Sequence, residues 1–408
     1  MRWLPSALAL SMPSSIICMA AGSSPTPRPS TMASKIISAT QQPLFSFGVI
    51  ADVQWADTED GYNFDKTVAR KYRGAFRNLI RAVDWWNGLP EPPNFIAQLG
   101  DLIDGINVKL GDSMPALEAA LTELERAPCP TINIVGNHEL YNFDRQALSR
   151  ASWLRHGDAE YYSFKPAPGW RFVVLDPYQQ ALIGHAADDP RRREAVKLIS
   201  KRNPGVDPSG VGGEWFKHVS GYDRRFVPYN GGLGSEQLAW LRGELHDASA
   251  LGERVCILCH VILHPEACGG STMVWDYPDA LQALGETSCV VAVLCGHDHF
   301  GQYHKDDNGI HHMTFCSPLN KGDEGAAFGL VHVWEDALEL RSPCVDDLLP
   351  ATRRGQSTGR PTKRQCVGVS GSQEESVWLP LRPCEDKRSS DAPSDAATAD
   401  SSDVSASA

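Results

Sequence analysis

Five short segments of the chain carry the residue types that bind divalent metal ions. They are Asp52-Val53-Gln54, Gly100-Asp101-Leu102-Ile103-Asp104-Gly105, Gly136-Asn137-His138-Glu139, the lone His260 and Gly296-His297-Asp298-His299. Their carboxylates, carboxamides and imidazoles suit manganese, iron, zinc or magnesium, and none of the positions requires a thiolate. One such segment alone is more often a turn or a cap than a metal site. Five in succession are hard to assign to turns, so the sequence predicts a metal site.

The spacing within these segments supports shared ions. In Asp52-Val53-Gln54 and His297-Asp298-His299, the first and third residues project to the same side of an extended chain, so both can reach one ion. The glycines that precede three of the segments allow a sharp backbone turn without a clash at Cβ. Two divalent ions about 3.5–4 Å apart would need a bridging carboxylate and would activate a water molecule for attack.

The metal-type residues mostly follow short apolar runs, which must position them. These runs are FSFGVIADV, FIAQLGD, TINIVGN, RFVVLD, RVCILCH and VVAVLCG. Their length and their flanking turn residues favour buried strands. Residues 66–87, 115–126 and 235–247 carry apolar side chains at spacings of three and four and predict helices. The sequence therefore predicts an α/β fold, in which segments at the carboxyl ends of strands converge on one crevice.

The two ends of the chain differ from its middle. Residues 1–42 contain no Asp or Glu and many Ser, Ala and Pro, a composition typical of a transit peptide. The alternatives are a secretory signal within residues 3–20, which Pro5 and Pro13 interrupt, and a true start at Met32. We expect a leader that is removed or disordered, and a protein of the cytoplasm or of an organelle, either plastid or mitochondrion.

Residues 344–408 lose the apolar periodicity and end in a stretch rich in Ser, Asp and Ala. Such a composition buries too little apolar surface to offset chain entropy, so it predicts a disordered tail. The expected organisation is a leader at residues 1–42, one catalytic domain at 43–343 and a tail at 344–408.

Charge and composition exclude several classes of partner. The 408 residues include 38 Lys and Arg against 50 Asp and Glu, a net charge of −12, which disfavours general nucleic-acid binding. No apolar run reaches the roughly 18 residues of a membrane span. We expect a monomer that acts on small molecules, without a nucleic-acid or membrane partner. The cysteines in apolar runs are expected to be reduced structural thiols; they are Cys256, Cys259, Cys289 and Cys295.

One basic stripe invites a functional interpretation. It consists of Lys66, Arg70, Arg73, Arg77 and Arg81. Their spacings of three and four place them on one face of a helix. A phosphate-binding face is one interpretation, but we favour a solvated surface stripe.

The five segments in this order, DVQ, GDLIDG, GNHE, His260 and GHDH, resemble the calcineurin-like metallophosphoesterases. Gln54 stands where most members carry His. With this departure, the chain is similar to the manganese-dependent ADP-ribose/CDP-alcohol diphosphatase branch. Four further segments carry this resemblance: DGYNF at 60–64, FVPYNGG at 226–232, the run at 260–275 and AFGLVHVWED at 327–336. The resemblance implies a sandwich of two mixed β-sheets flanked by helices, with the metal site at the strand ends. It also implies two divalent ions, manganese first, with magnesium, zinc or iron as alternatives.

The resemblance further implies roles for individual residues. One ion would be held by Asp52, Gln54, Asp101 and His299. The second would be held by Asp101, Asn137, His260 and His297, so that Asp101 bridges the two ions. His138 would protonate the leaving oxygen.

Other residues near the motifs are expected to support the site or to contact the substrate. We expect Asp104 and Glu139 to orient their neighbours from behind the ligands. Phe64 either stacks on a nucleobase or packs in the core. Thr272 and Trp275 follow His260 closely and are expected to line the substrate pocket.

The implied reaction is hydrolysis of the diphosphate bond in ADP-ribose and in CDP-alcohols such as CDP-choline, CDP-ethanolamine and CDP-glycerol. Two divalent cations and two aspartates leave a surplus of about +2, which suits a pyrophosphate anion. A phosphomonoesterase and a cyclic-nucleotide phosphodiesterase are alternatives on the same site. A non-catalytic scaffold is the alternative of another class, but it should show broken ligand motifs, and none is broken.

Overall fold

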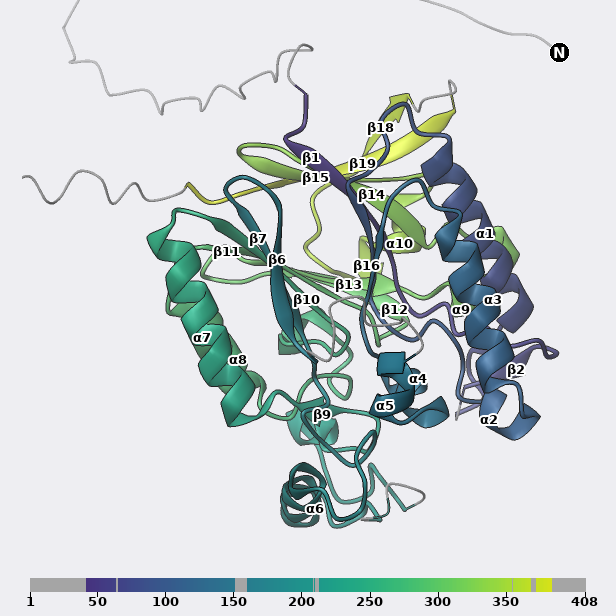
Figure 1. The fold of residues 1–408 in the computed structure, drawn as a ribbon. Coiled ribbons are helices and arrows are strands. Elements are labelled where there is room, and N and C mark those ends of the chain that lie inside the picture. The colour runs from purple at the N-terminus through teal and green to yellow at the C-terminus, as the bar shows by residue number, and fades with distance from the viewer. Residues whose placement is uncertain are drawn as a thin grey trace, which may run out of the picture. The chain divides into compact units, whose positions relative to one another are not determined.

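Two mixed β-sheets form the centre of the structure, which is a computed structural model (Figure 1). The described residues are 42–63, 65–150, 160–207, 209, 213–353, 355–367 and 372–383. The predicted leader, except for its last residue, lies outside the described residues, as do residues 384–408.

The larger sheet has seven strands in the described part of the chain. In spatial order they are β18 (Arg364–Val367), β19 (Gln373–Pro380), β15 (Ala337–Ser342), β14 (Phe328–Val333), β1 (Phe45–Ile50), β4 (Phe95–Gln98) and β5 (Thr131–Asn133). Strands β1, β4 and β5 run parallel, and the other neighbours pair antiparallel. The carboxyl ends of the three parallel strands therefore share one edge.

The smaller sheet has six strands among the residues that the structure describes. In spatial order they are β12 (Phe300–Lys305), β13 (His311–Cys316), β11 (Val290–Cys295), β10 (Arg254–Cys259), β7 (Trp170–Leu175) and β6 (Tyr162–Ala167). Strands β7, β10, β11 and β13 are parallel, and the two edge strands pair antiparallel. All six apolar runs predicted to be strands are strands: β1, β4, β5, β7, β10 and β11.

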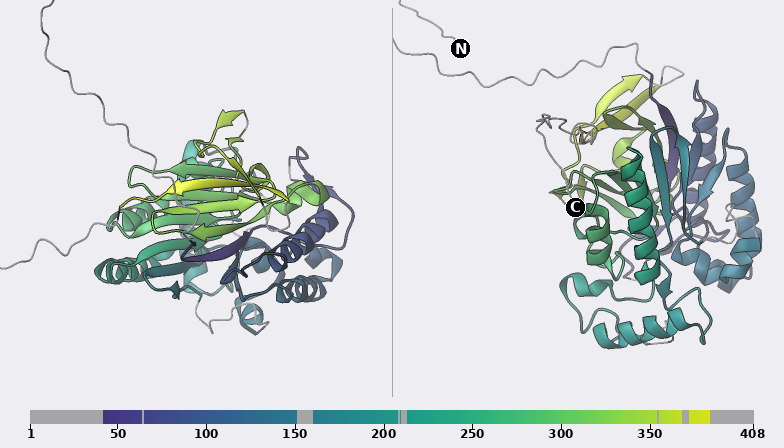
Figure 2. Two further views of the ribbon diagram at one scale, coloured as in Figure 1. Left: turned by 90° about the horizontal axis from the view of Figure 1, so that it is seen from above. Right: turned by 60° about the vertical axis from the view of Figure 1, so that its left-hand side comes forward.

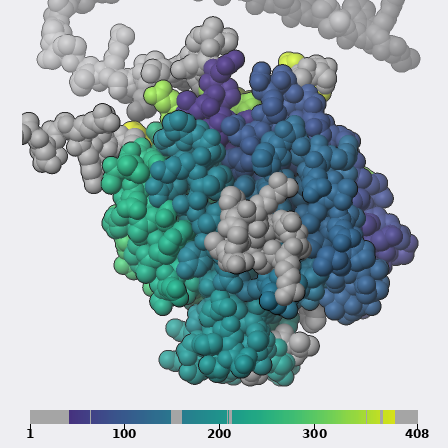
Figure 3. All heavy atoms as spheres, viewed as in Figure 1, coloured from purple at the N-terminus to yellow at the C-terminus, as the bar shows by residue number. Residues whose placement is uncertain are grey.

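Helices flank the two sheets. Helices α1 (Tyr72–Asn87) and α3 (Ser113–Glu125) contact each other beside the larger sheet, and α7 (Gly234–Ala250) and α8 (Tyr277–Gly285) lie beside the smaller one (Figure 1). Helix α6 (Pro190–Arg202) belongs to the teal segment in the lower part of Figure 3. The three helices predicted from apolar spacing correspond to α1, α3 and α7. No helix among the described residues is long and apolar enough to cross a membrane.

Short elements complete the connections. The short helices are α2 (Asn107–Leu110), α4 (Asn137–Asn142), α5 (Arg145–Arg150), α9 (Pro318–Lys321), α10 (Val345–Leu348), η1 (Gly221–Arg225), η2 (Pro265–Ala267) and η3 (Gly322–Glu324). The two-residue strands form three pairs: β2 (Gly61–Tyr62) with β3 (Ala69–Arg70), β8 (Gln180–Ala181) with β9 (Gly231–Gly232), and β16 (Thr352–Arg353) with β17 (Gln356–Ser357).

An aromatic core joins the two sheets. Phe47 and Phe95 of the larger sheet stack with ring centroids 5.1 Å apart, and Phe172 of the smaller sheet meets each of them edge-on at 5.2 Å. Edge-to-face and stacked pairs of this kind add to the free energy gained by burying the rings. The predicted sandwich of two mixed sheets is confirmed.

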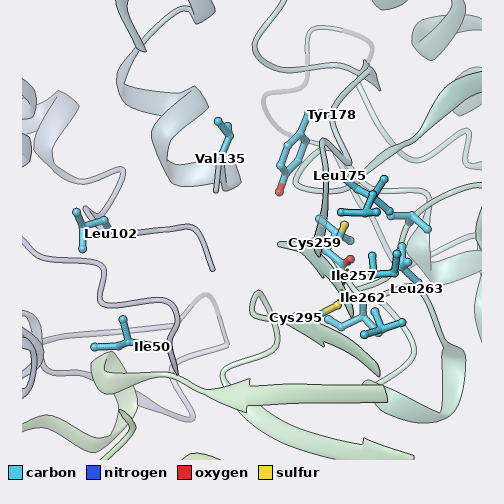
Figure 4. Close-up of a cluster of buried hydrophobic side chains, with 14 of the residues drawn as sticks. Ile50, Leu102, Val135, Leu175, Tyr178, Ile257, Cys259, Ile262, Leu263 and Cys295 are labelled. Carbon is cyan, nitrogen blue, oxygen red and sulfur yellow. Dashed lines mark hydrogen bonds between the residues drawn. The ribbon is translucent and has the colours of Figure 1, made fainter. Parts of the chain in front are cut away.

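A second apolar cluster lies near the strand ends that carry the metal-type residues. Figure 4 shows Ile50 and Leu102 across from Ile257, Cys259 and their neighbours. Cys259 is completely buried, and no cysteine among the described residues forms a disulfide. These thiols act as small apolar groups, as predicted.

The expectation of a disordered tail from residue 344 is wrong for the stretch that contains β18 and β19. Strand β19 pairs with β15 over six residues and extends the larger sheet (Figure 2, yellow). Buried side chains lie on both of its faces: Glu374 and Ser376, which are 3% and 2% exposed, point to one side, and the fully buried Val377 and Leu379 point to the other. A carboxylate of Glu374 accepts a hydrogen bond from Arg341 at 2.9 Å. Because the residues buried on one of the two faces are polar, the strand does not appear in the sequence as an apolar run.

Candidate metal centre

The metal-type residues come from loops at the carboxyl ends of five strands. Strands β1, β4 and β5 of the larger sheet lead to the first three segments, and β10 and β11 of the smaller sheet lead to the last two. The first two loops are joined by backbone hydrogen bonds from Asp52 N to Gly100 O (3.0 Å) and from Gln54 N to Asp101 O (2.9 Å). The structure brings all seven predicted ligands together, and every one except His299 is buried.

One half of the cluster contains Asp52, Gln54, Asp101 and His299. Nε2 of Gln54 lies 3.2 Å from Oδ2 of Asp101 and 2.8 Å from Nε2 of His299. Nε2 of His299 is 3.5 Å from Oδ1 of Asp52. Four potential ligands thus converge from three loops.

The Gln54 carboxamide offers a test of whether a cation fits. Its Oε1 atom is buried and has no hydrogen-bond partner. A half-turn of the terminal amide exchanges Oε1 and Nε2, which places the oxygen beside Asp101 and His299. The Gln54 oxygen is a buried acceptor that lacks a hydrogen-bond donor, and a hard divalent cation bound beside Asp101 and His299 would satisfy it. The donor set therefore fits a metal ion.

The other half of the cluster is centred on His260. Its Nε2 atom lies 3.3 Å from Oδ2 of Asp101, 3.3 Å from Oδ1 of Asn137 and 3.2 Å from Nδ1 of His297. Its Nδ1 atom donates to Leu99 O at 2.7 Å, so the lone pair of Nε2 faces the cluster. Among the described residues, only Asp101, His260 and His297 form a group of His, Cys, Asp or Glu with ligand atoms all within 4.8 Å of one another.

The backbone at the ligands is strained. Asp52, Gln54, Asp101 and His297 have φ values of 52°, 49°, 55° and 67°, in the left-handed region. Lys66 is the one other non-glycine residue of this kind in the described part of the chain. Such conformations persist only where the surrounding structure imposes them, and they gather at functional sites.

The glycines in the motifs serve two purposes. Gly100 has φ of 95°, as the predicted sharp turn requires, whereas Gly136 and Gly296 have no positive φ. At Gly136 an added Cβ would lie 2.0 Å from Oδ1 of Asp101, and at Gly296 it would lie 2.4 Å from Oδ2 of Asp52. These two glycines make room for the carboxylates of neighbouring loops, which the sequence alone did not indicate.

Electrostatics couples the two halves of the cluster. Burial alone would raise the pKa of Asp101, but His260 and His138 outweigh it and hold that pKa well below its usual range. Burial opposes protonation of His260, yet Asp101 raises the pKa of His260 to about 9. Burial and the neighbouring His260 lower the pKa of His297. Without a cation, a protonated His260 thus balances the Asp101 carboxylate.

Glu139 lies behind the ligands. Its carboxylate accepts hydrogen bonds of 2.8 Å from the backbone N–H groups of Asp101, Leu102 and Gly136. Burial, followed by the nearby Asp101, raises the pKa of Glu139 to about 8. The residue ties together two of the loops that present ligands, which is the place of a group that orients its neighbours.

His138 points one ring nitrogen at the cluster. Its Nδ1 atom accepts a hydrogen bond from Gly105 N at 2.7 Å, and its Nε2 atom lies 3.9 Å from Oδ2 of Asp101. In the neutral ring the proton is therefore on Nε2, which faces the site. Asp104 lies 3.4 Å from Nδ1 and is itself held by Arg70 at 3.1 Å.

The sequence profile described as "Calcineurin-like phosphoesterase" matches residues 45–301. The chain belongs to this family. A relative from Oryza sativa subsp. japonica is 39% identical over 306 residues, which cover 75% of this chain and 93% of the relative. A relative from Homo sapiens is 34% identical over 323 residues, which cover 75% and 92%. Both are named manganese-dependent ADP-ribose/CDP-alcohol diphosphatase.

A solved structure agrees with these relatives. The crystal structure of a dimetal phosphatase from Danio rerio matches with a TM-score of 0.68 and 32% sequence identity, and the match covers 74% of this chain and 96% of that one. The two-sheet sandwich is therefore that of a calcineurin-like phosphoesterase.

Two of the three predicted substrate contacts, Thr272 and Trp275, lie among the described residues. Phe64 lies outside the described residues. Oγ1 of Thr272 donates to Oδ2 of Asp298 at 2.9 Å. Trp275 is 2% exposed and packs in a separate apolar cluster with Phe226, so its side chain is not brought to the metal cluster.

Two residues at the centre were missed from the sequence. Oδ1 of Asn230 accepts a hydrogen bond from Nε2 of His297 at 2.7 Å, and Oη of Tyr178 donates to Oδ1 of Asn137 at 3.3 Å. Asn230 belongs to FVPYNGG, a segment that contributed to the family resemblance but to which no role at the site was assigned. Tyr178 follows the end of strand β7, so extending the strand-end argument to RFVVLD would have found it.

The predicted basic stripe on α1 and just before it is largely neutralised by acidic and carbonyl partners. Arg70 pairs with Asp104, and Arg77 pairs with Asp323. Arg73 pairs with two acidic side chains, and Arg81 donates to a backbone carbonyl. Only Arg73, Arg77 and Arg81 lie on α1, because Arg70 belongs to β3 and Lys66 precedes it, so the expected single helical stripe is wrong. The partners of the four arginines leave little free charge for a phosphate.

Proposed function

We propose that this protein hydrolyses the diphosphate bond of ADP-ribose and CDP-alcohols with the help of two divalent metal ions, manganese foremost. The convergence of all seven predicted ligands on one cluster carries the proposal. The named activity of the relatives from rice and human supplies the substrate class.

The ligands divide between the two ions as the distances suggest. One ion would be held by Asp52, Gln54, Asp101 and His299. The other would be held by Asp101, Asn137, His260 and His297. Asp101 is the carboxylate common to both halves, because its Oδ2 atom lies 3.2 Å from Gln54 and 3.3 Å from His260. When bound, the ions would supply Lewis-acid activation and neutralise charge on the diphosphate.

His138 would donate a proton to the departing phosphate. Its Nε2 atom faces the cluster, and Gly105 N–H fixes the ring by donating to Nδ1. Water adds across the diphosphate, so ADP-ribose gives AMP and ribose 5-phosphate, and CDP-choline gives CMP and phosphocholine. The atoms balance with one water molecule consumed for each bond broken.

The partners and the cellular location of the protein are also proposals. We propose that its substrates are small molecules and that it has no nucleic-acid partner, which the net charge of −12 supports. The acid-free residues 1–42 support a cytoplasmic or organellar location.

The test uses the full chain, stripped of metal and then supplied with manganese. ADP-ribose, CDP-choline, 2′,3′-cyclic AMP and p-nitrophenyl phosphate are offered separately, and products are identified by chromatography. We expect AMP and CMP from the first two substrates only when manganese is present. Faster hydrolysis of cyclic AMP or p-nitrophenyl phosphate would contradict the proposal and favour a phosphodiesterase or a phosphomonoesterase.

A variant of His138 tests its role in the same assay. General-acid catalysis contributes roughly 10²–10⁴-fold, so we expect His138→Ala to lower kcat by that factor. Its manganese affinity should stay close to that of the unaltered chain. The control is His246→Ala, an exposed histidine on α7. Full turnover by His138→Ala would contradict the acid role.

A further inference from the structure

Asp298 occupies the position between two of the proposed metal ligands. His297 and His299 direct their rings into the metal cluster, where they approach His260 and Gln54. The Asp298 carboxylate instead contacts Gly269, Thr272 and Arg353, none of which is a proposed ligand. The Asp298 side chain is almost completely buried, with 4% of its surface exposed.

Four hydrogen bonds converge on the Asp298 carboxylate from two other parts of the chain. Nη2 of Arg353 lies 2.9 Å from Oδ1 and 2.8 Å from Oδ2. Gly269 N and Oγ1 of Thr272 donate to Oδ2 at 2.8 and 2.9 Å. Arg353 is the one cationic side chain that pairs with Asp298 in the described part of the chain.

Arg353 itself is fixed by its surroundings. It lies in β16, within the region where the sequence predicted a tail, and its side chain is only 11% exposed. Its guanidinium carbon lies 5.6 Å from the centroid of the Phe300 ring. At Gly269 an added Cβ would lie 2.6 Å from Nη2 of Arg353, so the loop packs directly against the guanidinium. The C-terminal segment thus reaches the back of the His297–His299 loop.

This loop needs external support. His297 has φ of 67°, a strained backbone conformation for a residue with a side chain. A buried carboxylate that loses its cationic partner is strongly unfavourable, and it would reorganise toward solvent or another cation. Such a movement of Asp298 would displace both flanking histidines.

We propose that Arg353 is a positioning residue for the metal centre: through Asp298 it holds His297 and His299 where they can bind their ions. The proposal rests on the proposed function only in that the cluster binds metal. Residues outside a ligand shell that orient the ligands typically change metal affinity by about 10–100-fold when they are removed.

The test measures manganese affinity in the full chain, by titration of the metal-free protein followed by electron paramagnetic resonance of free Mn²⁺. The variants are Arg353→Met, Arg353→Lys and Asp298→Asn, with Arg364→Met as control. Arg364 lies on β18 in the same C-terminal segment and is exposed. Thermal unfolding of each metal-free variant separates loss of folding from loss of affinity.

We expect Arg353→Met to fold and to bind manganese about 10–100-fold more weakly, with Arg364→Met unchanged. Arg353→Lys should be weakened at least about threefold, because an ammonium lacks the planar fork of a guanidinium. Asp298→Asn should weaken binding as well, and adding Arg353→Met to it should cause little further loss.

Wild-type manganese affinity in both Arg353 variants would overturn the proposal. If Arg353→Met does not fold, Arg353→Lys decides in the same way: unchanged affinity overturns the proposal and weakened affinity supports it. A chain that binds manganese but cleaves neither ADP-ribose nor CDP-choline would contradict the proposed function and leave this measurement intact.

Discussion

His260 couples metal binding to pH at the scale of single residues. Asp101 raises its pKa to about 9 against an ordinary value of 6.5. In the metal-free protein, the protonated ring therefore stabilises the fold fully below about pH 6.5, and this contribution is lost as the pH rises through about 9. A metal ion needs the neutral ring, so it competes with this proton.

Manganese affinity should consequently rise with pH up to about 9. Each bound pair of ions should release up to one proton from His260 at pH 7, and affinity should fall by up to about tenfold per pH unit below pH 9. Calorimetric titrations in two buffers of different ionisation enthalpy measure the proton release. Affinity that is constant between pH 6.5 and 8.5 would contradict this account of His260.

At the scale of single residues, some parts of the metal site could be predicted from the sequence and others could not. Residue types and spacing were enough to predict a metal site in the five segments, because these segments follow apolar runs, whereas the choice of the seven ligands within them came from the family resemblance. Asn230 was not predicted because it reaches the cluster by tertiary contact alone, whereas Tyr178 follows the end of strand β7 and could have been predicted from that position. The role of Gly136 and Gly296 was not predicted either, because the carboxylates for which they make room come from other loops.

At the scale of elements, apolar patterning was informative wherever both faces of a strand are buried. All six residues of each of β1, β7 and β11 are buried, and these strands appear in the sequence as apolar runs that only Ser46 and Arg171 interrupt. Strand β19 differs because it buries the polar Glu374 and Ser376 on one face and the apolar Val377 and Leu379 on the other. Glu374 accepts hydrogen bonds from Arg341 of β15 and Trp85 of α1, which are distant in the sequence, so the sequence alone could not show that the segment folds.

Strand β19 is expected to be necessary for stability. A chain that ends at residue 343 loses β18, β19 and Arg353, and it exposes β15 as an edge. Val377 and Leu379 are fully buried, and each such side chain contributes about 1.5–3 kcal/mol on burial. We therefore expect the free energy of unfolding to fall by at least about 3–6 kcal/mol.

Urea unfolding of a chain spanning residues 42–343 measures this loss against one spanning residues 42–383, which keeps every described residue. Equal midpoints for the two chains would show that the C-terminal strands are dispensable. An insoluble shorter chain beside a folded longer one would agree with the expectation.

At the scale of the whole folded unit, the metal cluster lies where two sheets meet. The larger sheet supplies Asp52, Gln54, Asp101 and Asn137, and the smaller sheet supplies His260, His297 and His299. Ions bound between them bind the native state alone, so they should stabilise it as their concentration rises. Metal binding should therefore also stabilise the packing of the two sheets against each other.

The most direct test of the two-metal centre is to count and couple its ions. Electron paramagnetic resonance of the manganese-loaded full chain should show two Mn²⁺ per chain with magnetic exchange between them. Asp101→Ala should lose the coupled signal, because it removes the one carboxylate common to both halves. Two coupled ions in Asp101→Ala, or at most one ion in the unaltered chain, would contradict the account.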